Sequence, residues 1–213
     1  MTDAGTAAGM AASVWTVVVP LKSAAAGKSR LGVDAALVRA IGLDTVAAAA
    51  TAAAVVLVTA DAETARQAAA IDGVRVVTEP EPRGIAAAIE RGLAATTTPH
   101  RAVLLGDLPA LRGPDLTAAL DAAASHDRAV VADAEGTGST LVTAGAGIVW
   151  ASAFGADSFA RHVALGCVPL DIPATSTLRR DVDTPAQLAA AAALGLGPRT
   201  RAASPHAFPA RPR

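Results

Sequence analysis

VWTVVVP at residues 14–20, followed by LKSAAAGKSRL at residues 21–31, predicts a buried β-strand that runs into a basic loop. The first segment is almost continuously apolar and β-branched, which is typical of a strand covered on both faces of a sheet. The second contains small and basic residues, so its backbone can approach an anion closely. Ligands of open α/β sheets bind beyond the carboxyl ends of the strands. We therefore expect an anion-binding loop directly after the first strand.

The rest of the chain alternates between apolar runs and helical patterns. Strands are expected at Val55–Thr59, Val74–Val77, Ala102–Leu105 and Ala129–Val131, and less clearly at Thr140–Val142, Ile148–Trp150 and Val168–Ile172. Helices are expected at Asp34–Ala50, Ala62–Ala70, Gly84–Ala94, Asp115–Ala124, Asp157–Leu165 and after Thr184. This order predicts one α/β domain at residues 14–197, with a mixed, mainly parallel sheet flanked by helices. Disordered tails are expected at residues 1–13 and 198–213.

The composition excludes several classes of function. The formal net charge is −1, which leaves no basic field for nucleic acid or an anionic membrane. No apolar run is long enough to predict a membrane span. The single cysteine, Cys167, rules out a disulfide framework and a Cys-based zinc site, and favours a cytoplasmic setting. The only lysines, Lys22 and Lys28, both lie in the loop after the first strand.

That basic loop predicts a site for a nucleoside triphosphate. Lys22, Lys28 and Arg30 supply three cations there, and cations of this kind bind phosphate oxygens. GKS at residues 27–29 resembles the end of a Walker A motif. That motif needs a glycine where Lys22 stands, so a P-loop ATPase is rejected. The alternative is a solvated basic loop without a ligand.

Three aspartates are candidate metal ligands. Asp107 comes one glycine after a strongly apolar run, and Asp181 and Asp183 are separated by one residue. On an extended segment this pair would face one side, and two such carboxylates repel each other unless a cation lies between them. Magnesium prefers oxygen ligands and often bridges to phosphates. The pattern predicts a Mg²⁺ site, and the alternative is that Asp107 and Asp183 only cap the turn and the helix that follow them.

A further set of residues is a candidate site for a small phosphorylated acid. Ser139 offers a hydroxyl in the GTGST segment at residues 136–140, and Gly155 and Ser158 lie where a helix is expected to begin. Helix starts favour anions such as carboxylates, although glycine–serine loops are often ordinary turns. An acceptor phosphate is already ionised near pH 7, so the transfer needs no histidine base.

Taken in order, five motifs resemble the guanylyltransferases of coenzyme F-420 biosynthesis over roughly residues 15–197. These motifs are PLK…GKSRLG, GDLPAL, GTGS, FGADSFARH and RDVDTPAQL. The resemblance implies a nucleotidyltransferase fold, related to Rossmann-like folds, and transfer of GMP from GTP to phosphoenolpyruvate with release of pyrophosphate. It places Ala86 where relatives carry an asparagine, which is a departure from the family pattern.

The resemblance also implies roles for individual residues. Asp107, Asp181 and Asp183 fall on the family's metal-binding aspartates, and Ser139, Gly155 and Ser158 fall on its phosphoenolpyruvate contacts. GTP is expected to contact Pro20, Leu21, Lys22, Lys28 and Arg30. Catalysis is expected to depend on Lys22, Lys28, Arg30 and Asp107.

Several alternatives stay open at this point. The acceptor could instead be 2-phospho-L-lactate or 3-phosphoglycerate, because these acids differ only by small groups. A metal-dependent glycosyltransferase and a non-catalytic nucleotide-binding protein are more distant readings. The assembly is open between a monomer and a homodimer.

Overall fold

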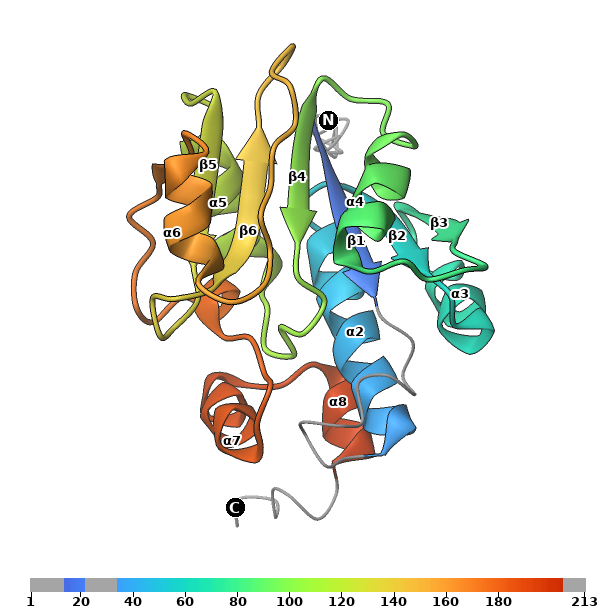
Figure 1. Cartoon of the computed structure of the whole chain (residues 1–213). Helices are drawn as coiled ribbons and strands as arrows, with labels where there is room; N and C mark the ends of the chain where they lie inside the picture. Colours follow the sequence, from blue (N-terminus) through green and yellow to red (C-terminus); the bar gives the residue numbers. More distant parts are fainter. Residues whose placement is uncertain (1–13, 22–33, 205–213) are drawn as a thin grey trace, which may run out of the picture.

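The computed structural model describes residues 14–21 and 34–204, which form a seven-stranded sheet with helices on both faces (Figure 1). The strand order is β3-β2-β1-β4-β6-β5-β7. The strands are β1 (Trp15–Leu21), β2 (Ala54–Thr59), β3 (Val74–Thr78), β4 (His100–Leu104), β5 (Arg128–Ala132), β6 (Ser139–Ala144) and β7 (Val168–Pro169). Only β6 runs against its neighbours, so the expected mixed, mainly parallel sheet is confirmed.

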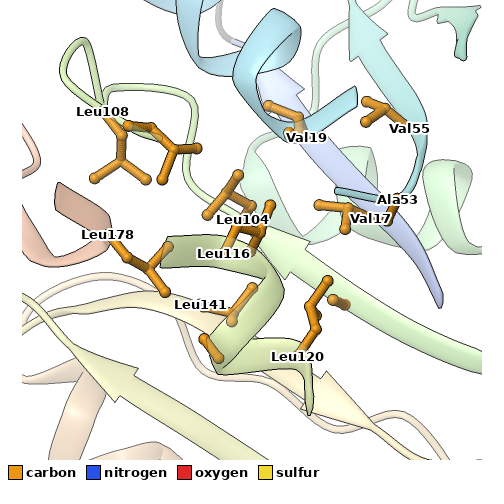
Figure 2. Packing of buried hydrophobic residues seen from close by; sticks show 14 of the residues in the cluster. Val17, Val19, Ala53, Val55, Leu104, Leu108, Leu116, Leu120, Leu141 and Leu178 are labelled. Atoms are coloured by element: carbon orange, nitrogen blue, oxygen red, sulfur yellow. The ribbon is translucent and has the colours of Figure 1, made fainter. Parts of the chain in front are cut away.

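Successive side chains of the central strands enter two separate cores. The larger core packs against α2 (Ala35–Ala50), α3 (Ala62–Ala68) and α5 (Gly113–Ala123), and it contains Val17 and Val19 (Figure 2). On the other face, Val18 packs beneath α4 (Ile85–Leu93), while α6 (Ser158–Ala164) lies over β5 and β6 (Figure 1). Burial on both faces explains why the strand sequences are continuously apolar rather than alternating.

The helix ends follow the local sequence rules. The Asp61 carboxylate accepts a hydrogen bond from the Thr64 amide at 2.7 Å and caps α3. Thr184 caps α7 (Pro185–Leu194) by accepting from the Gln187 amide at 3.2 Å, and this helix ends at Gly195 as expected. Such caps satisfy amides that have no partner within the helix.

Two segments differ from the sequence-based expectation. Residues 198–203 form a helix, α8 (Pro198–Ala203), where a disordered tail was expected. The buried carboxylate of Asp44 on α2 explains this difference, because it accepts hydrogen bonds from the Arg199 and Thr200 amides at 3.2 and 2.7 Å. Residues 148–150, expected as a weak strand, are not in the sheet. No helix in the described part of the chain is long and apolar enough to cross a membrane.

The sheet topology sets which loops meet. β1, β2, β3, β4 and β5 all end at the same edge, because β6 alone is antiparallel, and β6 therefore begins at that edge. Asp107 follows β4, Asp133 follows β5, and Ser139 opens β6. This carboxyl edge of the sheet is where polar groups from distant parts of the sequence come together.

Gly92 on α4 gives a stability prediction. A Cβ at this position would lie 2.9 Å from Val58 Cγ2 and closer still to Val18, and both are stiff, buried β-branched residues. Gly→Ala in a helix interior normally stabilises by about 1 kcal/mol, whereas overpacking a core costs typically 1–3 kcal/mol. Because the overpacking cost exceeds the helix gain, we expect Gly92→Ala to lower the free energy of unfolding by about 1–2 kcal/mol in urea titrations. The exposed Glu90→Ala on the same helix serves as the control, and a Gly92→Ala variant more stable than wild type would contradict the tight packing.

Candidate active site

Asp107 is held where β4 leaves the sheet. The Leu105 amide donates to the Thr140 carbonyl at 2.9 Å, so the segment after β4 still follows β6. The carbonyl of Asp107 accepts from the Val182 amide at 3.0 Å, which joins the end of β4 to a segment 75 residues away in the sequence. Asp107 and Asp181 are thereby neighbours in space.

The loop between β5 and β6 is organised by the carboxylate of Asp133. Asp133 is 7% exposed, and its two oxygens accept from the Thr137 amide at 2.9 Å and the Gly138 amide at 2.6 Å. Gly136 takes a positive φ of 77° inside this loop, a conformation that favours glycine. The turn places Glu135 on the same side as the Asp181 segment, since Glu135 Oε1 accepts from Gln187 Nε2 of α7 at 3.2 Å.

Hydrogen bonds attach the segment that carries Asp181 to helix α5 and to the β5–β6 loop. The segment follows the short 3-10 helix η1 (Thr177–Arg179), whose first residue donates from its amide to Asp115 Oδ2 at 2.7 Å. The guanidinium of Arg179 donates to the Asp133 carbonyl at 2.8 and 3.2 Å. These bonds bring the β5–β6 loop and the Asp181 segment together.

Three carboxylates converge as a result. One oxygen from each of Asp133, Glu135 and Asp181 lies within 4.8 Å of the others. Asp181 Oδ1 is buried and has no hydrogen-bond partner in the described residues. Burial is the largest cause that raises the pKa of Asp181, to about 7, and the negative charges of Asp107, Asp133 and Glu135 raise it further. We call this set of four residues the acidic cluster.

The acidic cluster fits a divalent cation by its chemistry. All of its donors are carboxylate oxygens, which hard cations such as Mg²⁺ prefer. A buried carboxylate oxygen without a hydrogen-bond donor, surrounded by like charges, is destabilised until a cation or a proton neutralises it. Asp181 has both of these properties. The arrangement can therefore bind a metal ion beside the phosphates of a nucleotide.

The raised pKa of Asp181 gives a pH prediction for the metal-free protein. The pKa is 3.8 for an ordinary aspartate and about 7 in the fold, so the folded state keeps a proton that the unfolded chain releases. The contribution of Asp181 to stability is then fully present below about pH 4 and is lost as the pH rises through 7. Asp181→Asn lacks this titration, so its Tm minus that of wild type should increase as the pH rises. After allowance for solvent screening, we expect this difference to grow by about 2–4 °C from pH 5.5 to pH 8.5 in chelator. An unchanging Tm difference across that range would contradict the assignment.

Only two of the five residues predicted to bind GTP lie in the part of the chain that the structure describes. Lys22, Lys28 and Arg30 lie outside the described residues, so their role stays a prediction. Pro20 and Leu21 form the last pairs of β1, opposite Val58 and Thr59 of β2. They therefore lie at the carboxyl edge, and their contact with GTP is a prediction that the fold does not test.

Asp183 differs from its expected geometry. Residues 181–184 do not form a strand, because the chain bends there to start α7, so the alternating pattern of a strand does not apply. Asp183 is exposed, and its amide donates to Gln187 Oε1 at 3.0 Å. It is not a member of the acidic group found among the described residues. Its predicted role as a metal ligand is untested.

The three predicted acceptor residues lie around α6. Ser139 and Ser158 are 1% and 3% exposed, and Ser139 Oγ lies 2.9 Å from Nδ1 of the buried His162. Gly155 has a φ of 120°, and a Cβ there would lie 3.1 Å from the guanidinium of Arg161. The amide of residue 159 donates to the Thr137 carbonyl at 3.1 Å, so α6 begins against the β5–β6 loop. The fold thus brings the acceptor candidates next to the loop that carries Asp133.

Sequence reasoning missed Asp133 and Glu135, and of His162 it suggested only a contact with the acceptor. The first had the same indication that singled out Asp107, since an acidic residue directly follows the apolar run at residues 129–132. Glu135 becomes a neighbour of Asp181 only through the turn at Gly136, which spacing does not reveal. His162 lies on an expected helix, but its burial and partners depend on tertiary packing.

Comparisons with known proteins identify the fold and the family. A model of the MobA-like NTP transferase domain matches residues 24–154. Among solved structures, a putative nucleotide-diphospho-sugar transferase from Desulfovibrio desulfuricans G20 superposes with a TM-score of 0.60 at 17% identity, covering 83% of this chain and 85% of its own. The fold and the family match together define an enzyme class, the nucleotidyltransferases.

Curated relatives are considerably more similar. A phosphoenolpyruvate guanylyltransferase from Sanguibacter keddieii is 44% identical, covering 87% of this chain and 82% of its own length. One from Streptomyces scabiei is 46% identical, covering 89% of this chain and 95% of its own length. The chain belongs to the family of MobA-like NTP transferases, with phosphoenolpyruvate guanylyltransferases among its relatives.

Proposed function

We propose that this protein transfers GMP from GTP to phosphoenolpyruvate, with Mg²⁺, and releases pyrophosphate, as a step of coenzyme F-420 biosynthesis. The observation that carries the proposal is the convergence of carboxylates on the half-buried Asp181 beside Asp107, at the carboxyl edge of the sheet. The substrates are inferred from the names of relatives that share 44–46% of their residues with it.

The bonds that change are few. An oxygen of the acceptor phosphate attacks the α-phosphorus of GTP, the bond from that phosphorus to the β-phosphate oxygen breaks, and pyrophosphate leaves. The acceptor oxygen is already ionised near neutral pH, so this chain does not need to supply a general base. Positioning and charge stabilisation then account for most of the rate.

The role proposed for each group of residues follows from its position. Asp107, Asp181, Asp133 and Glu135 would hold Mg²⁺, and Asp183 is a further candidate ligand. When bound, the ion neutralises phosphate charge and helps to align the reacting groups. Lys22, Lys28 and Arg30 are proposed to bind the triphosphate and to stabilise charge on the leaving pyrophosphate. Ser139, Gly155 and Ser158 are proposed to orient the acceptor.

Release of pyrophosphate from GTP in the presence of one acceptor at a time tests the proposal. The panel contains phosphoenolpyruvate, 2-phospho-L-lactate and 3-phosphoglycerate, and product masses are measured. We expect release to require GTP, phosphoenolpyruvate and Mg²⁺ together, with a product of the mass of enolpyruvoyl-diphosphoguanosine. Turnover with only another acid would move the assignment to that acid. Release with none of the three would overturn the proposal.

A further inference from the structure

His162 is a buried titratable residue that the proposed chemistry does not use. It lies on α6 and is 0% exposed. Its ring makes an edge-to-face contact with Phe154, with centroids 4.8 Å apart and an interplanar angle of 70°. Both ring nitrogens are also engaged, Nδ1 with Ser139 Oγ at 2.9 Å and Nε2 with the Ala153 amide at 2.8 Å.

The Ala153 contact determines where the proton of the ring lies. A backbone amide can only donate, so Nε2 of His162 must accept and carries no hydrogen. A neutral imidazole has one donor and one acceptor, and its proton is therefore on Nδ1. The Nδ1–H then donates to Ser139 Oγ. Burial, as the largest cause, and the charge of Arg161 lower the pKa of His162 to about 4 against a hydrogen bond to the Ser158 backbone, which raises it, so the ring is neutral at physiological pH.

Because Ser139 Oγ accepts in this hydrogen bond, its own hydroxyl hydrogen has no acceptor among the described residues. Ser139 Oγ accepts from His162, and no second hydrogen bond to this oxygen is found in the part of the chain that the structure describes. The side chain is 1% exposed, so water does not satisfy the donor freely. Ser139 also opens β6 at the carboxyl edge, directly after the loop that carries Asp133 and Glu135. A buried hydroxyl with an unpaired hydrogen at this place suits an anionic oxygen of a ligand.

We propose that His162 is a positioning residue for the acceptor, which fixes Ser139 Oγ so that its hydrogen points to the carboxylate or phosphate of the small acid. This inference rests on the proposed function. Two features of α6 support it: its attachment to the β5–β6 loop through Thr137, and the close approach of Arg161 to Gly155. The role differs from catalysis, since His162 contacts Ser139 and not the reacting atoms.

Two amide variants of His162 separate its two hydrogen bonds. The amide group of asparagine stands at the same number of bonds from Cα as Nδ1, whereas the amide group of glutamine stands at that of Nε2. His162→Asn can therefore keep the bond to Ser139, and His162→Gln can keep the bond to Ala153. Both lose the ring, so each is a control for the packing defect of the other.

The measured quantities are KM for each substrate and kcat. We expect His162→Gln to raise KM for phosphoenolpyruvate about tenfold, the equivalent of one lost charge-assisted hydrogen bond, with KM for GTP unchanged. His162→Asn should stay within about threefold of wild type for both substrates. His126→Gln, at the opposite end of β5, is the control and should change neither constant.

A variant that tests the same bond without removing a buried ring is Ser139→Ala. If the two residues act as a unit, Ser139→Ala and the double variant with His162→Gln should raise KM for phosphoenolpyruvate equally. Nitrogen-15 NMR of the wild-type ring gives a readout independent of activity, and we expect the proton on Nδ1.

Three results would overturn the inference. These are a proton on Nε2, equal KM changes for GTP and phosphoenolpyruvate in His162→Gln, or additive effects in the double variant. If the wild type is active and the variants are unaffected, only the role of His162 is refuted and the proposed function stands. A wild type that accepts no phosphorylated acid refutes the proposed function and this role with it.

Discussion

Replacing Asp181 with asparagine is expected to lower kcat on the order of a thousandfold while leaving the metal-free fold at least as stable as wild type. Activity falls because asparagine removes the carboxylate on which Asp107, Asp133 and Glu135 converge. Stability does not fall, because the same change removes a charge that is repelled by its neighbours and partly cut off from water. An ordinary buried-site mutation would lower both quantities.

Pyrophosphate release and thermal unfolding in chelator measure the two effects of Asp181→Asn. Asp171→Asn is the matched control, since Asp171 is exposed and outside the acidic cluster. The control should leave kcat and Tm unchanged. An Asp181→Asn enzyme with at least a tenth of the wild-type kcat would show that this carboxylate is not central to the chemistry.

Leu178→Ala is expected to lower the free energy of unfolding by about 3 kcal/mol, which corresponds to a fall in Tm of about 10 °C. Leu178 is 0% exposed and packs into the larger core, where Figure 2 shows it among the other leucines of the cluster. Truncation removes apolar contacts and leaves a cavity that the rigid helix α5 cannot fill. Because Leu178 belongs to η1, three residues before Asp181, we also expect weaker Mg²⁺ binding.

Chemical denaturation measures the stability of Leu178→Ala, and a Mg²⁺ titration of activity measures its effect on the metal. Leu165→Ala, at a leucine that is 41% exposed, is the control and should cost less than about 1 kcal/mol. If both variants lost the same stability, η1 would not be anchored in the core as described.

Most of the fold could be predicted from the sequence, because both faces of the sheet are buried. Continuous apolar runs such as residues 14–19 and 55–59 have few alternatives in a chain with helical patterns between them. Segments with weaker patterns were less predictable. Helix α8 depends on Asp44, which lies more than 150 residues earlier in the sequence and caps it only in the folded state.

The candidate site could be predicted only in part. Asp107 and Asp181 were both singled out, and the fold brings them together through the bond between the Asp107 carbonyl and the Val182 amide. Glu135 was not, because a glycine turn creates its contact, and the bond of His162 to Ser139 was not, because it depends on the packing of α6. Asp183 was singled out by a strand pattern that the start of α7 replaces.

The most direct test is a crystal structure of this protein with GTP and Mn²⁺, in which anomalous scattering locates the metal. The account predicts a metal peak within coordination distance of the Asp181 carboxylate and at least one other member of the acidic cluster. GTP bound at the carboxyl edge with no metal at these carboxylates would contradict the account.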